Sequence, residues 1–140
     1  MEGSSMKKLT VSLLQLNGWA AVLIGSYIVL DPVTMLAPYG LQSDLSAGLM
    51  SELRAPGGLL LICGLMIARC GLNSALHTQG LMLSIAVYGG YGGARLLGFI
   101  LDGQPPIEIL VATTIELVLL VLSSAVIYKQ KTVVRMALSR

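Results

Sequence analysis

Four runs of apolar residues divide the chain, and polar residues or helix breakers separate them. The runs cover residues 9–30, 51–68, 76–101 and 107–128. A helix needs about 20 apolar residues to cross a bilayer, and the second run reaches this length only when residues 51–54 are counted with it. Backbone polar groups in hydrocarbon must be satisfied within the segment, so each run is expected to be helical. The pattern predicts an all-α integral membrane four-helix bundle, a single domain over residues 9–128.

Composition supports the same class. Hydrophobic residues make up 55% of the 140 residues and charged residues 11%, with a mean hydropathy of +0.82. Soluble domains carry about 25% charged residues, so the lipid bilayer is the expected surrounding. The net charge is only +2 and there is no basic block interleaved with aromatic residues. No nucleic-acid partner is therefore expected.

The first run resembles a signal peptide, because Lys7 and Lys8 precede it. The run is longer than the apolar region of a signal peptide, and no small-x-small cleavage site follows before Asp31. We therefore expect a retained helix. Residues 1–5 resemble a vector remnant ahead of a native start at Met6, within an N-terminal segment 1–8.

Basic residues indicate the orientation of the helices. They gather at the N-terminus, in the second connection and in a tail over residues 129–140, at Lys7, Lys8, Arg69, Lys129, Lys131, Arg135 and Arg140. The other two connections contain Asp31, Asp44 and Asp102 and no lysine. By the positive-inside rule, both termini are cytoplasmic and the first and third connections face outward.

The first outer connection, residues 31–50, is much longer than the others and contains two prolines and two glycines. Its stretch "VTMLAPYGL" is too apolar for a free loop and too short to span a bilayer. We expect it to form a short interfacial helix or a cap over the bundle.

Small residues recur at helical spacing in two of the runs. In the third run they recur every four positions, at Ala86, Gly90, Ala94 and Gly98, with Gly89 and Gly93 beside them. In the second run glycines recur every seven positions, at Gly57, Gly64 and Gly71. Small residues let membrane helices approach closely, so tight packing between the second and third helices is favoured. Room for a ligand is the second interpretation, and the same faces could join a membrane partner or a second copy.

Two charged residues lie well inside the apolar runs. Arg95 is about 10 Å below the outer boundary and Glu116 about 14 Å below it, at about 1.5 Å per residue. A charge at such depth costs about 2.5 to 3.5 kcal/mol on insertion scales and is usually paired or functional. Side chains lean toward the N-terminus of their helix, so these two lean toward each other. The sequence predicts an ion pair between Arg95 and Glu116.

Further polar residues share the outer half of the predicted bundle. The candidate ligand-binding residues are Glu52, Arg54, Tyr88, Tyr91, Arg95, Asp102 and Glu116. Four of them follow one helical face of the third run, at i, i+3, i+7 and i+14. A structural network and a polar binding cavity that opens outward both remain compatible with this cluster.

Several chemistries find no support in the sequence. The single histidine, His77, cannot supply a bis-histidine haem or a histidine-rich metal site. Cys63 and Cys70 are about 10 Å apart along one helix, which is beyond disulfide reach. No cofactor or metal is expected. Trp19 is expected to pack between helices, and Asn17 to form a hydrogen bond across them.

At the level of motifs, "SELRAPGG" (51–58), "RLLGFILDGQPP" (95–106) and a glutamate ten residues later resemble a known family. It consists of short bacterial four-helix integral membrane proteins catalogued as a domain of unknown function, and it is more remotely similar to DoxX-like proteins. The matching positions are Glu52, Arg54, Gly57, Gly58, Arg95, Gly98, Asp102, Gly103, Pro105 and Glu116. The resemblance covers residues 7–135 and implies a multi-pass protein of the bacterial inner membrane.

Three classes of function remain. The first is the binding of a small amphipathic molecule or lipid headgroup in the outer half of the bundle. The second is an accessory or structural subunit of a membrane complex. The third, a small proton-coupled transporter using Glu116, is less favoured because Arg95 would keep that carboxylate ionised. An enzyme would have to draw its acid and base from Glu52, Glu108, Glu116 and the tyrosines, so a non-catalytic protein is favoured.

Overall fold

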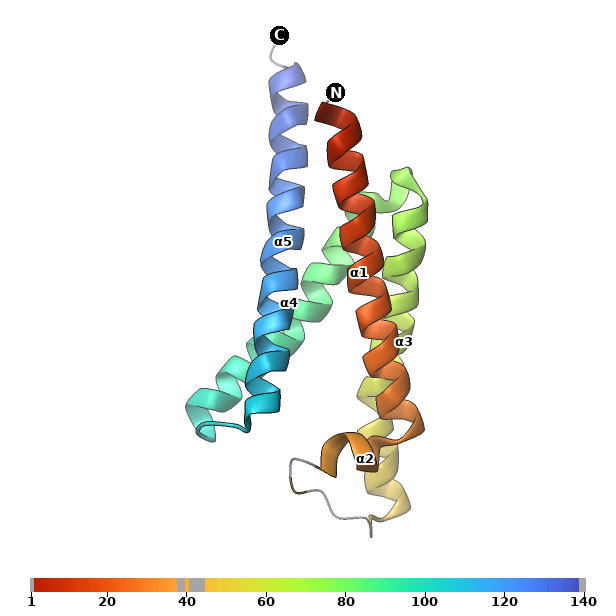
Figure 1. The fold of residues 1–140 in the computed structure, drawn as a ribbon, viewed down its shortest axis with the longest axis vertical. Coiled ribbons are helices and arrows are strands. Elements are labelled where there is room, and N and C mark those ends of the chain that lie inside the picture. The colour runs from red at the N-terminus through yellow and green to blue at the C-terminus, as the bar shows by residue number, and fades with distance from the viewer. Residues whose placement is uncertain (1, 38–39, 41–44, 139–140) are drawn as a thin grey trace.

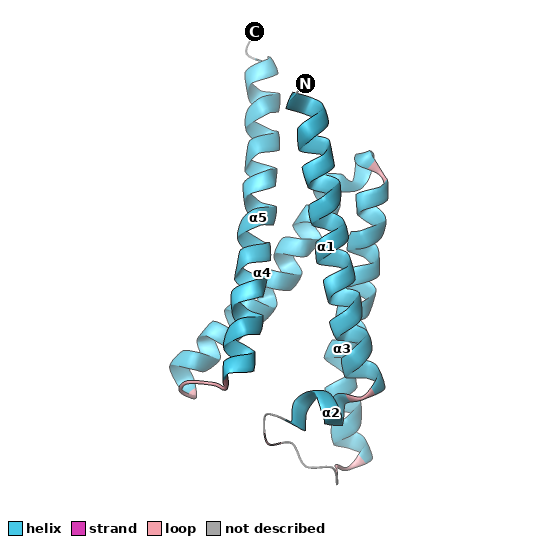
Figure 2. Cartoon of the chain, in the orientation of Figure 1, coloured by secondary structure: helices cyan, strands magenta, loops and turns pink. Residues whose placement is uncertain are grey.

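The computed structural model describes residues 2–37, 40 and 45–138, and within these residues it contains helices and no strand (Figures 1 and 2). The helices are α1 (Glu2–Leu30), α2 (Pro32–Leu36), α3 (Ala47–Leu72), the short 3₁₀ helix η2 (Ser74–Leu76), α4 (His77–Leu101) and α5 (Ile107–Leu138). The all-helical class predicted from the sequence is therefore correct.

Three helices among the described residues are long and apolar enough to cross a membrane: Ser4–Leu30, Ala47–Leu72 and Ile107–Gln130. Helix α4 has 25 residues and is therefore about 37 Å long at about 1.5 Å per residue. This is longer than the hydrocarbon core of a bilayer, which is about 30 Å thick. Its six glycines and its polar residues lower its hydropathy. The three apolar helices indicate a membrane protein. That α4 also crosses the membrane stays a prediction.

The long helices extend beyond three of the four predicted runs. Helix α3 continues four residues past each end of residues 51–68, and α5 continues ten residues past Tyr128. Helix α1 begins at Glu2, so the segment 1–8 joins the first helix. Ser46 accounts for the early start of α3, because its hydroxyl accepts a hydrogen bond from the Leu49 amide at 3.2 Å and caps the helix.

The short helix α2 lies in the connection where an interfacial helix or cap is predicted. Pro32 occupies its first turn, and the Asp31 carboxylate accepts a hydrogen bond from the Thr34 amide at 3.1 Å. Hydrogen bonds from Thr34 hold the pKa of the exposed Asp31 carboxyl below its usual value. Part of the predicted cap, at residues 38, 39 and 41, lies outside the described residues.

The long helices associate mainly as two pairs, α1 with α3 and α4 with α5. In Figure 1, the start of α1 and the end of α5 lie at one end of the molecule, while α2 and the α4–α5 connection lie at the other. Helix α4 runs obliquely, so its C-terminal end is far from the N-terminal end of α3 (Figure 1). The two helix pairs therefore diverge toward the end that carries α2.

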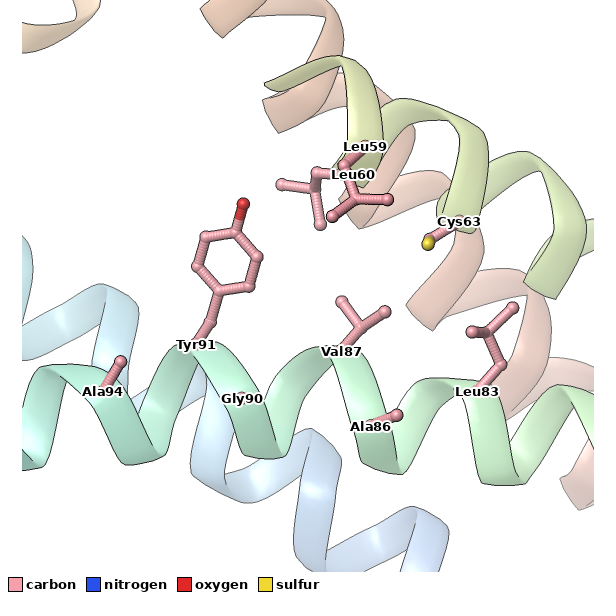
Figure 3. Close-up of a pocket in the computed structure, with 9 residues that line it drawn as sticks. All are labelled: Leu59, Leu60, Cys63, Leu83, Ala86, Val87, Gly90, Tyr91 and Ala94. Carbon is pink, nitrogen blue, oxygen red and sulfur yellow. The ribbon is translucent and has the colours of Figure 1, made fainter. Parts of the chain in front are cut away.

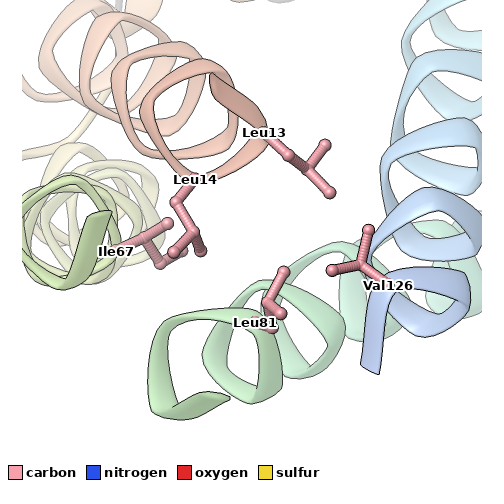
Figure 4. Packing of buried hydrophobic residues seen from close by; sticks show 5 residues of the cluster. All are labelled: Leu13, Leu14, Ile67, Leu81 and Val126. Atoms are coloured by element: carbon pink, nitrogen blue, oxygen red, sulfur yellow. The ribbon is translucent and has the colours of Figure 1, made fainter. Parts of the chain in front are cut away.

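Buried aliphatic side chains join all four long helices (Figure 4). The cluster consists of Leu13 and Leu14 from α1, Ile67 from α3, Leu81 from α4 and Val126 from α5. Lipid tails are as apolar as leucine, so the gain inside a bilayer comes from dispersion between closely packed side chains and not from the exclusion of water.

Glycines form the closest helix contact, between α1 and α3. A Cβ atom placed on Gly18 would lie 2.5 Å from the Ala68 amide nitrogen, and one on Gly25 would lie 2.5 Å from the Leu61 amide nitrogen. A Cβ atom on Gly64 would lie 2.7 Å from the Gly18 carbonyl oxygen. The glycine stripe of α3 thus packs on α1, so its predicted contact with the third helix is wrong.

The stripe of small residues on α4 does not make the predicted close contact either. A Cβ atom on Gly90 or Gly93 would have no heavy atom within 4 Å. The physical reason is the oblique course of α4, which carries this part of the helix away from α3 (Figure 1). Gly92 comes closer to α5, where its Cβ atom would lie 3.1 Å from a methyl carbon of Leu117.

Candidate functional site

Helix α4 carries three polar side chains on successive turns, and each reaches a different helix. The Tyr88 hydroxyl donates a hydrogen bond to the Asn17 carbonyl of α1, and Tyr88 is buried. The Tyr91 hydroxyl donates to the Pro56 carbonyl of α3 at 3.2 Å. Arg95, the third, faces α5. These residues fix the crossing of α4 over its neighbours.

The predicted ion pair is present. Arg95 Nε lies 3.2 Å from Glu116 Oε2, and the side chains of Arg95 and Glu116 are 28% and 13% exposed. Both atoms are themselves buried, yet neither makes a hydrogen bond. A hydrogen bond weakens steeply when the N–H does not point at the acceptor, so charge alone holds this pair. The pair therefore keeps unused hydrogen-bonding capacity.

A second polar contact lies deeper in the protein. Asn17 is fully buried, and its Nδ2 group donates to the Ser123 hydroxyl of α5 at 2.9 Å. The prediction that Asn17 bonds across helices is therefore confirmed. The expected packing of Trp19 is wrong, because this side chain is 53% exposed and its Nε1 group donates to Gln15 of the same helix at 3.0 Å. One turn of α1 thus presents Asn17 inward and Trp19 outward.

The other three predicted site residues lie at helix ends and are exposed. Arg54 Nε donates to the Val29 carbonyl at 3.0 Å, which satisfies one of the free carbonyl groups in the last turn of α1. Glu52 is exposed in the first turns of α3, and Asp102 is exposed at the C-terminal cap of α4. Among the described side chains the pair of Arg95 and Glu116 is the only ion pair, so these three are not joined to it in this way.

An apolar groove lies between α3 and α4 and has a volume of about 450 Å³. It is lined by Leu59, Leu60 and Cys63 of α3 and by Leu83, Ala86, Val87, Gly90, Tyr91 and Ala94 of α4 (Figure 3). Tyr91 supplies the one hydroxyl group in the lining of the groove. Leu59, Ala86, Gly90 and Ala94 are exposed, so the groove is open along one side. The volume falls in the range of about 300 to 1,000 Å³ that is usual for small-molecule sites.

Sequence reasoning missed most of this groove. Of the predicted site residues only Tyr91 lines it. The signal was the stripe of Ala86, Gly90 and Ala94, for which room for a ligand was the second interpretation, and these three residues line the groove. The apolar residues of α3 carry no distinguishing pattern.

Little in the described residues suggests metal or thiol chemistry. They contain no group of three or more histidine, cysteine, aspartate or glutamate side chains arranged to hold a metal ion. Cys63 and Cys70 are free thiols, and both are partly exposed.

Residues 10–126 match a protein family described as "Domain of unknown function (DUF4345)". The chain belongs to this family. The match covers the greater part of all four long helices and includes the ion pair, the buried Asn17 and the groove. Membership in DUF4345 confirms the expected domain of unknown function, while bacterial origin and similarity to DoxX-like proteins stay predictions. No curated protein and no solved structure matches the chain.

Proposed function

We propose that this DUF4345 protein is a four-helix bundle of a bacterial inner membrane that binds an anionic amphipathic molecule, such as a lipid headgroup, at Arg95. Both termini would be cytoplasmic. The shared end of α1 and α5 in Figure 1 and the basic residues near both termini support this orientation. The binding site would then lie in the outer half of the bundle.

The state of Arg95 is the observation that carries the proposal. Its guanidinium group has several N–H donors and no acceptor; the buried Nε atom faces Glu116, so a ligand would bind the accessible part of the group. Unsatisfied polar groups in hydrocarbon are costly. A phosphate or carboxylate offers acceptors in the planar geometry that a guanidinium prefers. The 28% exposure of the Arg95 side chain leaves it accessible to such a group.

Glu116 would hold Arg95 in place and limit its positive charge. An arginine without a partner at this depth would be costly to insert, and a fully hydrogen-bonded pair would have little capacity for a ligand. The observed pair is neither unpaired nor fully hydrogen-bonded, because Arg95 Nε lies 3.2 Å from Glu116 Oε2 and neither atom makes a hydrogen bond. An anionic ligand could therefore bind Arg95 without displacing Glu116.

The test measures the stabilisation of purified protein by short-chain lipids. The melting temperature in detergent should rise more with dioctanoyl phosphatidylglycerol than with dioctanoyl phosphatidylcholine. A double variant, Arg95→Leu with Glu116→Leu, removes both charges together and should fold while losing this preference. Arg69→Leu is the control, because it removes an exposed arginine in the last turn of α3, away from Arg95. A double variant that keeps the full preference for the anionic lipid would refute the proposal.

A further inference from the structure

We propose that the groove between α3 and α4 holds the hydrocarbon chain of the amphiphile whose anionic group binds Arg95. This inference rests on the proposed function and adds the class of ligand: an anionic lipid or fatty acid that binds with its chain inside the protein.

The groove is elongated along α4. On α4 its lining runs from Leu83 to Ala94 along one helical face, a length of about 16 Å at about 1.5 Å per residue. The floor consists of the small residues Ala86, Gly90 and Ala94, while Leu59 and Leu60 of α3 form the opposite wall (Figure 3). Side chains next to a void lose dispersion contacts, so a flexible hydrocarbon chain is a suitable occupant.

The polar groups lie at one end of the groove. Tyr91 is part of the lining, and Arg95 follows it by four residues on the next turn of α4, beside the groove, where it pairs with Glu116 of α5. In the proposed orientation α4 runs outward, which places Arg95 at the outer end and Leu83 nearer the midplane. An amphiphile with its anionic group at Arg95 would therefore point its chain inward, as a lipid of the outer leaflet does.

Tyr91 also argues against a helix as the occupant. Its hydroxyl group bonds to the Pro56 carbonyl, so the side chain extends from α4 to α3 at the outer end of the groove (Figure 3). A membrane helix is about 10 Å wide with its side chains and would have to run past this ring. A hydrocarbon chain can pass beside the ring on the open side, where Gly90 and Ala94 are exposed.

A matched pair of glycines provides the test. A Cβ atom on either Gly90 or Gly93 has no heavy atom within 4 Å, so neither site opposes a side chain at its Cβ atom. Only Gly90 lines the groove. Gly90→Leu should therefore fill the site, and Gly93→Leu should add the same side chain to the same helix outside it. Ala94→Leu fills the same groove and replaces Gly90→Leu if that variant does not fold.

The probe is phosphatidylglycerol with a photoactivatable diazirine in its acyl chain, presented to the protein in nanodiscs. Crosslinks in the parent should map by mass spectrometry to residues 59–63 and 83–94. Gly90→Leu should reduce this labelling about tenfold, equivalent to about 1.4 kcal/mol, and Gly93→Leu should leave it nearly unchanged. Equal labelling of both variants would identify ordinary surrounding lipid and overturn the inference.

Two further outcomes separate this inference from the proposed function. If a phosphatidylcholine probe labels the groove as strongly as phosphatidylglycerol and Gly90→Leu still abolishes labelling, the chain site stands and the role of Arg95 fails. If native mass spectrometry shows a dimer that Gly90→Leu disrupts while the lipid probe labels elsewhere, the groove docks a second copy and the inference fails.

Discussion

Alanine at Gly64 and at Gly90 should change stability in opposite directions. Both glycines are in helix interiors, where alanine gains up to about 1 kcal/mol over glycine. At Gly64 the new Cβ atom would lie 2.7 Å from both the Gly18 carbonyl oxygen and the Val22 amide nitrogen. These are backbone atoms, so α1 as a whole must move. Overpacking of this kind costs about 1 to 3 kcal/mol, and Gly90 has no neighbour to clash with.

The propensity gain is common to both variants, so the difference between them isolates the steric cost of about 1 to 3 kcal/mol. Unfolding can be followed by far-UV circular dichroism as sodium dodecyl sulfate is titrated into mixed micelles. Gly64→Ala should unfold at a lower detergent fraction than the parent, and Gly90→Ala at the same fraction or a higher one. Equal midpoints for the two variants would refute the close contact between α1 and α3.

Three further predictions concern the ion pair, Arg54 and the membrane topology. Arg95→Leu and Glu116→Leu should each destabilise by about 3 kcal/mol, the lower end of the range for breaking a buried pair, because Arg95 is partly exposed. The double variant should recover most of this loss in the same unfolding assay, and additive losses would contradict the coupling. Arg54→Leu should cost only about 0.3 to 1 kcal/mol, the usual value of an exposed cation at a helix C-terminus, and should keep the preference for anionic lipid. Reporter fusions should place the α3–α4 connection in the cytoplasm and the α4–α5 connection outside, and a periplasmic signal from a C-terminal reporter would contradict this topology.

Helix ends could be predicted from sequence where a breaker follows the apolar run. Helices α1 and α4 end at the predicted residues, because Asp31-Pro32 and Asp102-Gly103 stop them. Gly103 has a φ of +95°, a conformation that glycine adopts without strain. The start of α3 was less visible, because charged residues follow the Ser46 cap and interrupt the apolar pattern. Hydropathy indicates which residues lie in lipid, and a helix can begin several residues before the part that lies in lipid.

Partners of individual residues were harder to predict than the residues themselves. Opposite charges at similar depth have few ways to be neutralised, so the pair of Arg95 and Glu116 followed from sequence. A glycine stripe shows that a face can approach a neighbour closely but not which neighbour. The α3 stripe at Gly64 meets Gly18 of α1, whereas Gly90 borders a groove. This difference arises from the crossing angle of α4, which no local pattern records.

In the proposed orientation, the buried residues on the cytoplasmic side of the ion pair favour binding over transport. Along α5, Ser123 lies two turns after Glu116 and accepts a hydrogen bond from Asn17. Among the described residues, the next side-chain hydrogen bond from α5 to another helix is from Gln130 to Thr10 of α1, seven residues further and therefore about 10 Å away at about 1.5 Å per residue. Val126 lies between the two contacts, in the cluster that joins all four long helices. A proton or solute moving from Glu116 to the cytoplasm would have to cross this apolar layer, so transport requires the helices to separate there, whereas binding from the outer side leaves the layer closed.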